Sequence, residues 1–275
     1  MRIALGQISC ELKRPFDLSF LAAYGEPFVV FDQQQSGNLC FGVQGREGKL
    51  FLKVAGAETT RSCVAPEEAV RRMREASVVW RDLAHPALLR LLEDRPIAGG
   101  YLQVFEYFEG RCMGRQYDDH ERFLRLPLEE KLNIYQTILE FHDHVNRCGY
   151  VAIDFYDGCV MYDFDAHETR LCDVEFYQRM PVINEMGRMW GSSRYMSPEE
   201  FTLGATIDER SNVYTMGQTA FQLLGGGTDY ALGKWQASKA LHTVALKAVK
   251  ERREERYPSV GAYLAIWNET RKIES

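Results

Sequence analysis

Residues 150–177 read YVAIDFYDGCVMYDFDAHETRLCDVEFY. Two apolar runs flank a polar DFYDG segment at 154–158, and a third apolar run around 170–172 ends at Asp173. Short apolar runs separated by turn residues predict a loop followed by a β-hairpin. The loop and the hairpin hold two carboxylates, Asp154 and Asp173, nineteen positions apart. The stretch therefore predicts a site whose chemistry uses two acids.

Before this stretch, apolar and polar residues alternate as they do in the strands of a β-sheet. We expect strands at 27–32, 38–44, 49–55, 87–94 and 101–108, with a short helix at 16–25. A longer helix is expected at 65–85, because Pro66 lies near its start and acidic residues occupy its first turn. Residues 1–108 thus predict a mostly antiparallel sheet with one principal helix.

From residue 109 onward the periodicity becomes helical. Helices are expected at 127–149 and 209–227, and two more on either side of Tyr257-Pro258. A β-rich part at 1–108 and a helical part at 109–275 predict two lobes with a cleft, which is a preferred place for a ligand.

Composition and charge exclude several classes of protein. With 33 basic and 39 acidic residues, the net charge of -6 argues against a dedicated nucleic-acid binder. The densest basic run, 247–256, alternates with glutamates and predicts a solvated helix face. Seven scattered cysteines without a C-x-x-C pair indicate reduced thiols in a cytoplasmic protein. No signal peptide is apparent, and no apolar run approaches the ~18 residues that a membrane span needs.

Several short motifs, in order, resemble the eukaryotic-type protein kinases over nearly the whole chain. FLKV at 51–54 resembles the third-strand lysine element, and LQVFEYFEG at 102–110 is similar to the hinge. VAIDFYDGC at 151–159 stands where the catalytic loop belongs, and CDVEF at 172–176 stands where D-F-G belongs. The resemblance implies an α+β, bilobal protein-kinase-like fold with a small β-rich N-lobe and a larger helical C-lobe.

The resemblance also implies roles for individual residues, with ATP and Mg²⁺ as cofactors. Lys53 would pair with the nucleotide phosphates and Glu75 would hold it in an ion pair. Asp154 matches the catalytic base and Asp173 the magnesium ligand. The remaining nucleotide-binding positions would be Gly37 in the reduced glycine loop QQQSGN, and Glu106 and Phe108 in the hinge.

The second half of the resemblance concerns the helical part. GSSRYMSPEEF at 191–201 resembles the end of an activation segment, and DERSNVYTMG at 208–217 resembles the buried helix that follows it. Arg256 resembles the late arginine that pairs with the glutamate of that segment, here Glu199. We therefore expect a largely buried Glu199–Arg256 ion pair.

The catalytic loop departs from the family's pattern. Ala152 and Ile153 replace the usual His and Arg, Tyr156 replaces a lysine, and Cys159 replaces the asparagine that holds a second metal. A thiol is a soft ligand that suits Mg²⁺ poorly. Asp157 is either an additional metal ligand or a cap of the tight Asp-Gly turn. In addition, Glu175 replaces the glycine of D-F-G, and Asn212 replaces an aspartate that braces the loop.

Three functions remain open at this point. The first is an ATP-dependent phosphotransferase, a divergent serine/threonine protein kinase. The second is a catalytically impaired, nucleotide-binding pseudokinase that acts through a partner. The third is a small-molecule kinase of the aminoglycoside or choline type, a class that shares the bilobal core. The stretch between Gly227 and Gln236 is short where protein kinases usually carry a docking helix for protein substrates, so the sequence does not identify the substrate.

Overall fold

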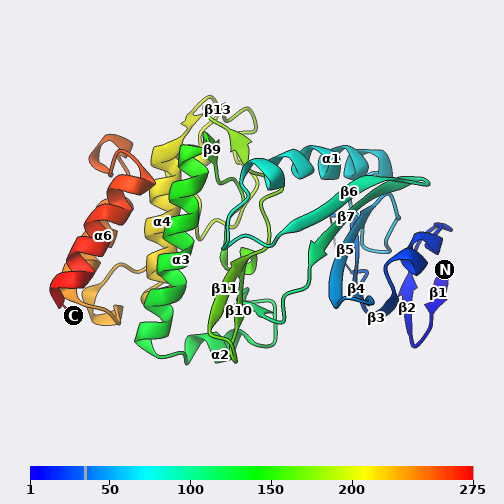
Figure 1. The fold of residues 1–275 in the computed structure, drawn as a ribbon. Coiled ribbons are helices and arrows are strands. Elements are labelled where there is room, and N and C mark those ends of the chain that lie inside the picture. The colour runs from blue at the N-terminus through cyan, green and yellow to red at the C-terminus, as the bar shows by residue number, and fades with distance from the viewer. Residues whose placement is uncertain (34–35, 275) are drawn as a thin grey trace. The chain divides into compact units, whose positions relative to one another are not determined.

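The computed structural model describes residues 1–33 and 36–274, and divides the chain into two compact units. The N-terminal unit is Met1–Glu109 and the C-terminal unit is Gly110–Ser275. Figure 1 shows both in ribbon form, with the N-terminal unit running from blue through cyan to blue-green and the C-terminal unit from green to red. The fold is α+β, and every strand pair is antiparallel.

The N-terminal unit is built on a five-stranded sheet, as the alternation of residues predicts. Its strand order is β3(Glu26–Phe31), β4(Leu39–Gln44), β5(Lys49–Ala55), β7(Gly100–Glu106) and β6(Leu91–Ile97). A separate hairpin joins β1(Arg2–Leu5) to β2(Ile8–Glu11). The helix expected at 16–25 is only a short 3-10 turn, η1(Ser19–Ala23), because Gly25 ends it after one turn.

The two faces of this sheet bury different residues. Alternate residues of β4, β5 and β7 pack on one face with the N-terminal hairpin and η1: Leu39, Phe41, Val43, Leu52, Val54, Leu102 and Val104. The other face is covered by α1(Pro66–Asp82), which buries Ala69, Met73, Ala76, Ser77 and Trp80. Lys53 belongs to this second face, since side chains alternate along β5.

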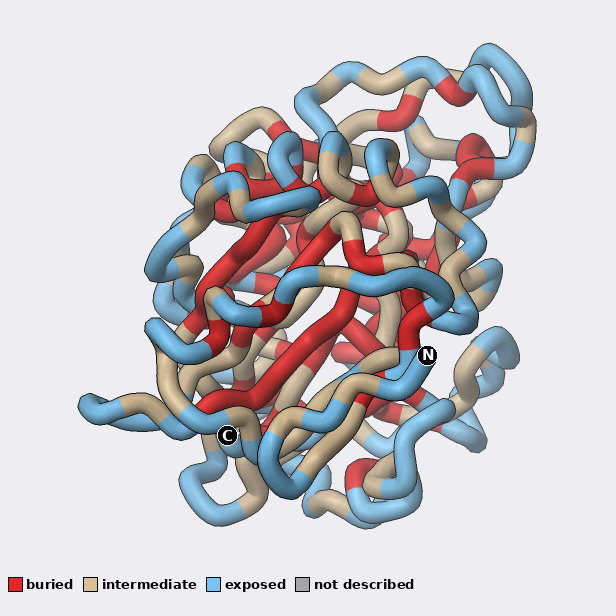
Figure 2. The backbone as a smooth tube through the Cα atoms, turned by 90° about the vertical axis from the view of Figure 1, so that its right-hand side faces the viewer, coloured by how far each residue is buried: buried red, intermediate tan, exposed pale blue. Residues whose placement is uncertain are grey.

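The C-terminal unit is mainly helical. Its helices are α2(His120–Leu124), α3(Leu128–Arg147), α4(Glu209–Leu224), α5(Lys239–Ala248) and α6(Val260–Glu274). α3 and α4 lie side by side (Figure 1), and Tyr135 of α3 donates a hydrogen bond to the Met216 carbonyl of α4 at 2.8 Å. α4 buries residues on nearly every side, which explains its apolar sequence. Exposed residues, pale blue in Figure 2, lie mostly along the loops and the outer faces of the helices.

Short strands hold the loops of this unit. The hairpin expected from the opening stretch is confirmed as β10(Val160–Asp163) and β11(Glu168–Leu171), with β8(Arg111–Cys112) on the other side of β10. Two small pairs join β9(Tyr150–Val151) to β12(Gln178–Arg179), and β13(Val182–Ile183) to β14(Thr206–Ile207). The remaining 3-10 turns are η2(Asp157–Cys159), η3(Pro198–Phe201), η4(Leu232–Lys234) and η5(Arg253–Glu255).

The solvated helix face predicted at 247–256 is confirmed only in part: positions 247, 250–252, 254 and 255 are exposed, but the segment is not one helix. α5 ends at Ala248, and Arg253 and Arg256 turn inward to carbonyl and carboxylate groups of other segments. In the part of the chain that the structure describes, no helix combines the length and apolar character of a membrane span.

Candidate active site

A buried side chain of α4 restrains the loop that carries Asp154. Asn212, buried in α4, accepts a hydrogen bond from the Ala152 amide at 2.8 Å and donates one to the Tyr150 carbonyl at 3.2 Å. A buried side-chain amide that satisfies two backbone groups of a loop restrains that loop strongly. Asn212 therefore braces the loop even though it stands where an aspartate was expected.

Asp154 has an unusual backbone conformation, with φ at 63°. Few residues other than glycine adopt positive φ, and aspartate is among those that tolerate it best. The Cys159 thiol donates a hydrogen bond to the Asp154 carbonyl at 3.6 Å, which helps to hold this conformation. Such backbone conformations are found where the position of a side chain matters for function.

Asp154 and Asp173, both in the C-terminal unit, lie close enough for their charges to interact. Burial and, to a smaller extent, the negative charge of Asp173 together raise the pKa of Asp154 to about 7. The Glu175 amide donates to the Asp173 carboxylate at 3.3 Å. A carboxyl group with a pKa near neutrality is suited to accept a proton from a hydroxyl.

The same two carboxylates suit a hard divalent cation. Carboxylate oxygens are the ligands that Mg²⁺ prefers, and a bound cation would offset the repulsion that Asp173 exerts on Asp154. Within residues 1–33 and 36–274, no group of three or more His, Cys, Asp or Glu side chains is arranged to hold a metal ion. Mg²⁺ usually keeps several water ligands and uses only one or two carboxylates, so a pair of acids is a sufficient protein contribution.

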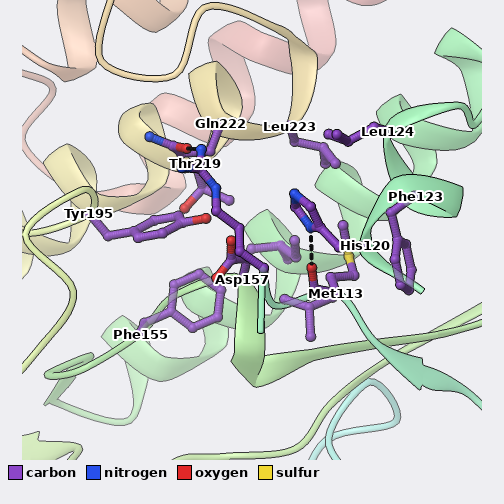
Figure 3. Close-up of a pocket in the computed structure, with 13 residues that line it drawn as sticks. Met113, His120, Phe123, Leu124, Phe155, Asp157, Tyr195, Thr219, Gln222 and Leu223 are labelled. Carbon is purple, nitrogen blue, oxygen red and sulfur yellow. Dashed lines mark hydrogen bonds between the residues drawn. The ribbon is translucent and has the colours of Figure 1, made fainter. Parts of the chain in front are cut away.

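Asp157, the second predicted metal ligand, is engaged elsewhere. Its two carboxylate oxygens accept hydrogen bonds from Arg194 at 3.0 and 3.2 Å, and its side chain is 12% exposed. It also lines a pocket with Phe155 and Tyr195, drawn in Figure 3. The expectation that Asp157 supplies a metal ligand is therefore corrected: an arginine neutralises this carboxylate.

Two substitutions in the loop are explained by packing. The Tyr156 ring lies against Gly158, where a Cβ atom would come within 2.4 Å of the ring. Burial raises the pKa of Tyr156 above its usual range, so this side chain stays neutral where the family has a lysine. Burial also raises the pKa of Cys159 well above its usual value, so Cys159 is an uncharged, structural thiol.

In the N-terminal unit, Lys53 and Glu75 are not placed as the resemblance implies. Lys53 lies on the face of the sheet that α1 covers, with Gln103 directly opposite on β7. Glu75 is 62% exposed, and its carboxylate accepts two hydrogen bonds of 2.7 Å from Arg71, one turn earlier on α1. The expected Lys53–Glu75 ion pair is therefore corrected: Glu75 pairs with a surface arginine.

The other positions predicted to bind the nucleotide lie at or near the ends of strands. The Glu106 carboxylate accepts a hydrogen bond from the Arg90 amide, and the Glu106 amide donates one to the Arg90 carbonyl, both at 3.1 Å. Phe108 is half-buried two residues after β7 ends. Gly37 has φ at 81°, a conformation that favours glycine, but two residues of its turn, 34–35, lie outside the described residues.

Sequence reasoning missed Arg194. This arginine joins the segment at 191–201 to the loop at 152–159 through Asp157, and it also donates to Gln222 of α4 at 3.4 Å. The sequence did offer one signal: Arg194 is the only charged residue in GSSRYMS at 191–197, and the predicted catalytic loop at 152–159 carries only acidic charges. Arg115, which donates to the same Gln222 oxygen at 3.2 Å, gave no signal at all.

Comparisons with known proteins point in one direction. No family model matches the sequence. Over 128 residues the chain is 29% identical to the serine/threonine-protein kinase PksC of Streptomyces coelicolor. The matched region covers 45% of this chain and 23% of PksC, so the chain is similar to a minor part of that protein. The similarity supports a distant, kinase-like relationship.

Proposed function

We propose that this chain is a divergent ATP-dependent phosphotransferase of the serine/threonine protein-kinase type. The observation that carries the proposal is the pair Asp154 and Asp173, two carboxylates held near each other by a loop and a hairpin, with the pKa of Asp154 raised to about 7. The similarity to a bacterial serine/threonine kinase adds support.

In this proposal Asp154 orients the acceptor hydroxyl and accepts its proton. Phosphoryl transfer involves little covalent chemistry by the protein, so the positioning of groups supplies most of the catalysis. The braced loop fits that requirement, because Asn212 fixes the backbone on which Asp154 is carried. Asp173 would hold Mg²⁺, which would neutralise charge on the phosphates.

The nucleotide would be bound by the residues that the resemblance assigns. Lys53 would pair with the phosphates, Gly37 would allow the turn after β3 to approach them, and Glu106 and Phe108 would contact the adenine. Glu75 has no part in the proposal, because Arg71 holds it at the surface.

A nucleotide-binding pseudokinase is the second candidate, and two observations favour it. Tyr156 is a neutral side chain where a lysine would stabilise the transferring phosphate. Glu75, the helix glutamate that the resemblance assigns to the site, accepts two hydrogen bonds from Arg71 at the surface instead. Removal of one preorganised group that stabilises charge in the transition state lowers the rate of an enzyme by about 10²–10³-fold. The proposed enzyme is therefore expected to be slow.

One experiment separates the two candidates. Thermal-shift titrations with ATP, with and without Mg²⁺, are followed by transfer of the γ-phosphate to the protein itself and to casein. The proposed enzyme is stabilised by ATP in a Mg²⁺-dependent way and transfers phosphate. Asp154→Asn retains the stabilisation and loses transfer, and Asp173→Asn loses the Mg²⁺-dependent part of the stabilisation.

The matched control is Asp165→Asn, at an exposed position in the turn between β10 and β11. It is expected to behave like wild type in both assays. Mg²⁺-dependent stabilisation of wild type without any transfer would overturn the phosphotransferase and support the pseudokinase. Absence of ATP-induced stabilisation would overturn both.

A further inference from the structure

The C-terminal unit contains a pocket that the proposed phosphotransferase does not use. Its volume is about 330 Å³, and it lies among α2, α3, α4 and the residues around Asp157 (Figure 3). Binding sites for small molecules are concave, mostly apolar and of roughly 300–1,000 Å³. The pocket therefore has room for a compact ligand.

One side of the pocket is apolar. α2, α3 and α4 each contribute to it, and so do the loop before β10 and β10 itself: Phe123, Leu124, Ile138, Phe155, Val160 and Leu223. Apolar surface of this kind gains free energy when a hydrocarbon chain or a ring displaces water from it. The apolar side thus favours the uncharged body of a ligand.

The rim of the pocket carries an excess of positive charge. The Gln222 side-chain oxygen accepts hydrogen bonds from Arg115 at 3.2 Å and from Arg194 at 3.4 Å, so two guanidinium groups converge on one neutral oxygen. Asp157 neutralises Arg194. Among the described residues, no carboxylate pairs with Arg115 (Figure 3 shows its neighbour Gln222 at the rim).

A hydrogen-bond donor at the rim also lacks an acceptor. The Gln222 side-chain oxygen accepts from both arginines, so the other polar atom of this amide is its nitrogen, which is a donor. Among the described residues, no acceptor is bonded to that nitrogen. His120 donates from Nδ1 to the Met113 carbonyl at 2.9 Å, so this ring proton is already used and is not available to a ligand (Figure 3). One free amide donor beside one uncompensated guanidinium forms a place for an anion.

We infer that this pocket binds a small amphipathic carboxylate. The carboxylate accepts hydrogen bonds from the Arg115 guanidinium and the Gln222 amide, and the apolar body lies against Phe123, Leu124 and Leu223. Arg194 and Asp157 compensate each other and set the position of Gln222. A cationic or neutral ligand of the same shape gains the apolar contacts only. The inference does not depend on nucleotide binding or phosphate transfer.

Octanoate and octanamide test this inference, because they share an alkyl chain and differ in charge. Titrations of the full chain, without nucleotide, are followed by ligand-observed NMR. We expect wild type to bind octanoate about tenfold more tightly than octanamide, the difference that one charged hydrogen bond gives. Arg115→Gln should lower the affinity for octanoate about tenfold and leave the affinity for octanamide unchanged.

Two further variants complete the design. Arg125→Gln changes an arginine just after α2 whose side chain is 80% exposed and paired with Glu121, and it should bind both ligands like wild type. Leu223→Trp fills the apolar side and should weaken both ligands equally. Equal affinities of wild type for octanoate and octanamide, an affinity for octanoate that Arg115→Gln does not change, or no binding of octanoate would each overturn the inference.

Discussion

Arg256 and Glu199, which are 57 residues apart in the sequence, form a buried, bidentate ion pair. The Arg256 guanidinium donates to the two Glu199 oxygens at 2.7 and 2.9 Å, with side-chain exposures of 0% and 8%. Its remaining hydrogen bonds go to the Lys250, Arg210 and Glu251 carbonyls. The pair expected from the sequence is confirmed, and it fastens the segment at 191–201 to the connection between α5 and α6.

Arg256→Ala should destabilise the protein by about 3–5 kcal/mol, because it leaves the Glu199 charge buried without a partner. Urea unfolding of wild type and variant measures the difference. Arg252→Ala is the control, since the Arg252 side chain is 71% exposed and pairs with Glu254. It should unfold like wild type. An Arg256→Ala variant as stable as wild type would show that the pair contributes nothing.

Glu75→Gln should leave both the melting temperature and the affinity for ATP unchanged, because Glu75 forms only an exposed pair with Arg71. Lys53→Met should weaken ATP binding without lowering stability. Lys49→Met is the matched control on the same strand and the same face, where Lys49 pairs with Glu109 at the surface. Calorimetric titration with MgATP measures all three. A Glu75→Gln variant that binds ATP as poorly as Lys53→Met would restore the Lys53–Glu75 pair.

The position of Glu75 could have been derived from the helix itself. Successive residues are rotated by about 100°, so Glu75 lies about 200° around the axis from Met73. Met73, Ser77 and Trp80 follow the spacing of a buried face, and all three are buried. The resemblance to the kinases selected Glu75, while the helical period placed that residue on the opposite, exposed side. Local periodicity was the better guide.

Other features required tertiary information. The alternation of β3, β4 and β5, the helices α1, α3 and α4, and the β10–β11 hairpin follow from periodicity and turn residues, so the sequence predicts them. Arg194 reaches Asp157 across 37 residues of sequence, and nothing local to either residue specifies that partner. The same holds for Arg253 and Arg256, whose alternation with glutamates resembles a solvated surface although Arg256 is buried. A charged side chain with a distant partner cannot be told from a solvated one by its neighbours in the sequence.

Asp157→Asn should leave the Mg²⁺ requirement of ATP binding unchanged, because Arg194 occupies the carboxylate. It should lower stability by about 1–3 kcal/mol, the cost of leaving a partly buried charged partner with a poorer acceptor. Arg194→Met should have a similar effect, and the double variant should lose less than the sum of the two. Urea unfolding gives the stabilities, and thermal shift at graded Mg²⁺ gives the requirement. A higher Mg²⁺ requirement in Asp157→Asn would return this residue to the metal site.

The last prediction concerns acid sensitivity, and it follows from His142 in α3. This side chain is fully buried, with Nδ1 bonded to the Ile138 carbonyl at 2.8 Å and Nε2 to the Tyr177 hydroxyl at 2.9 Å. Nδ1 therefore donates and Nε2 accepts, so the ring is neutral. Burial lowers the pKa of His142 to about 4, whereas an unfolded histidine titrates near 6.5. Between these values the unfolded chain binds more protons than the folded one.

His142 should therefore contribute a loss of stability that begins below pH 6.5 and is complete near pH 4, amounting to about 3 kcal/mol. His142→Gln should be less stable than wild type at pH 7 because it disturbs two buried hydrogen bonds, yet it should lose less stability between pH 7 and pH 5. Urea unfolding at both pH values measures this loss. His167→Gln, at a position that is 62% exposed, should lose as much stability as wild type. If His142→Gln loses as much as wild type over the same range, the acid sensitivity comes from other groups and His142 is not its source.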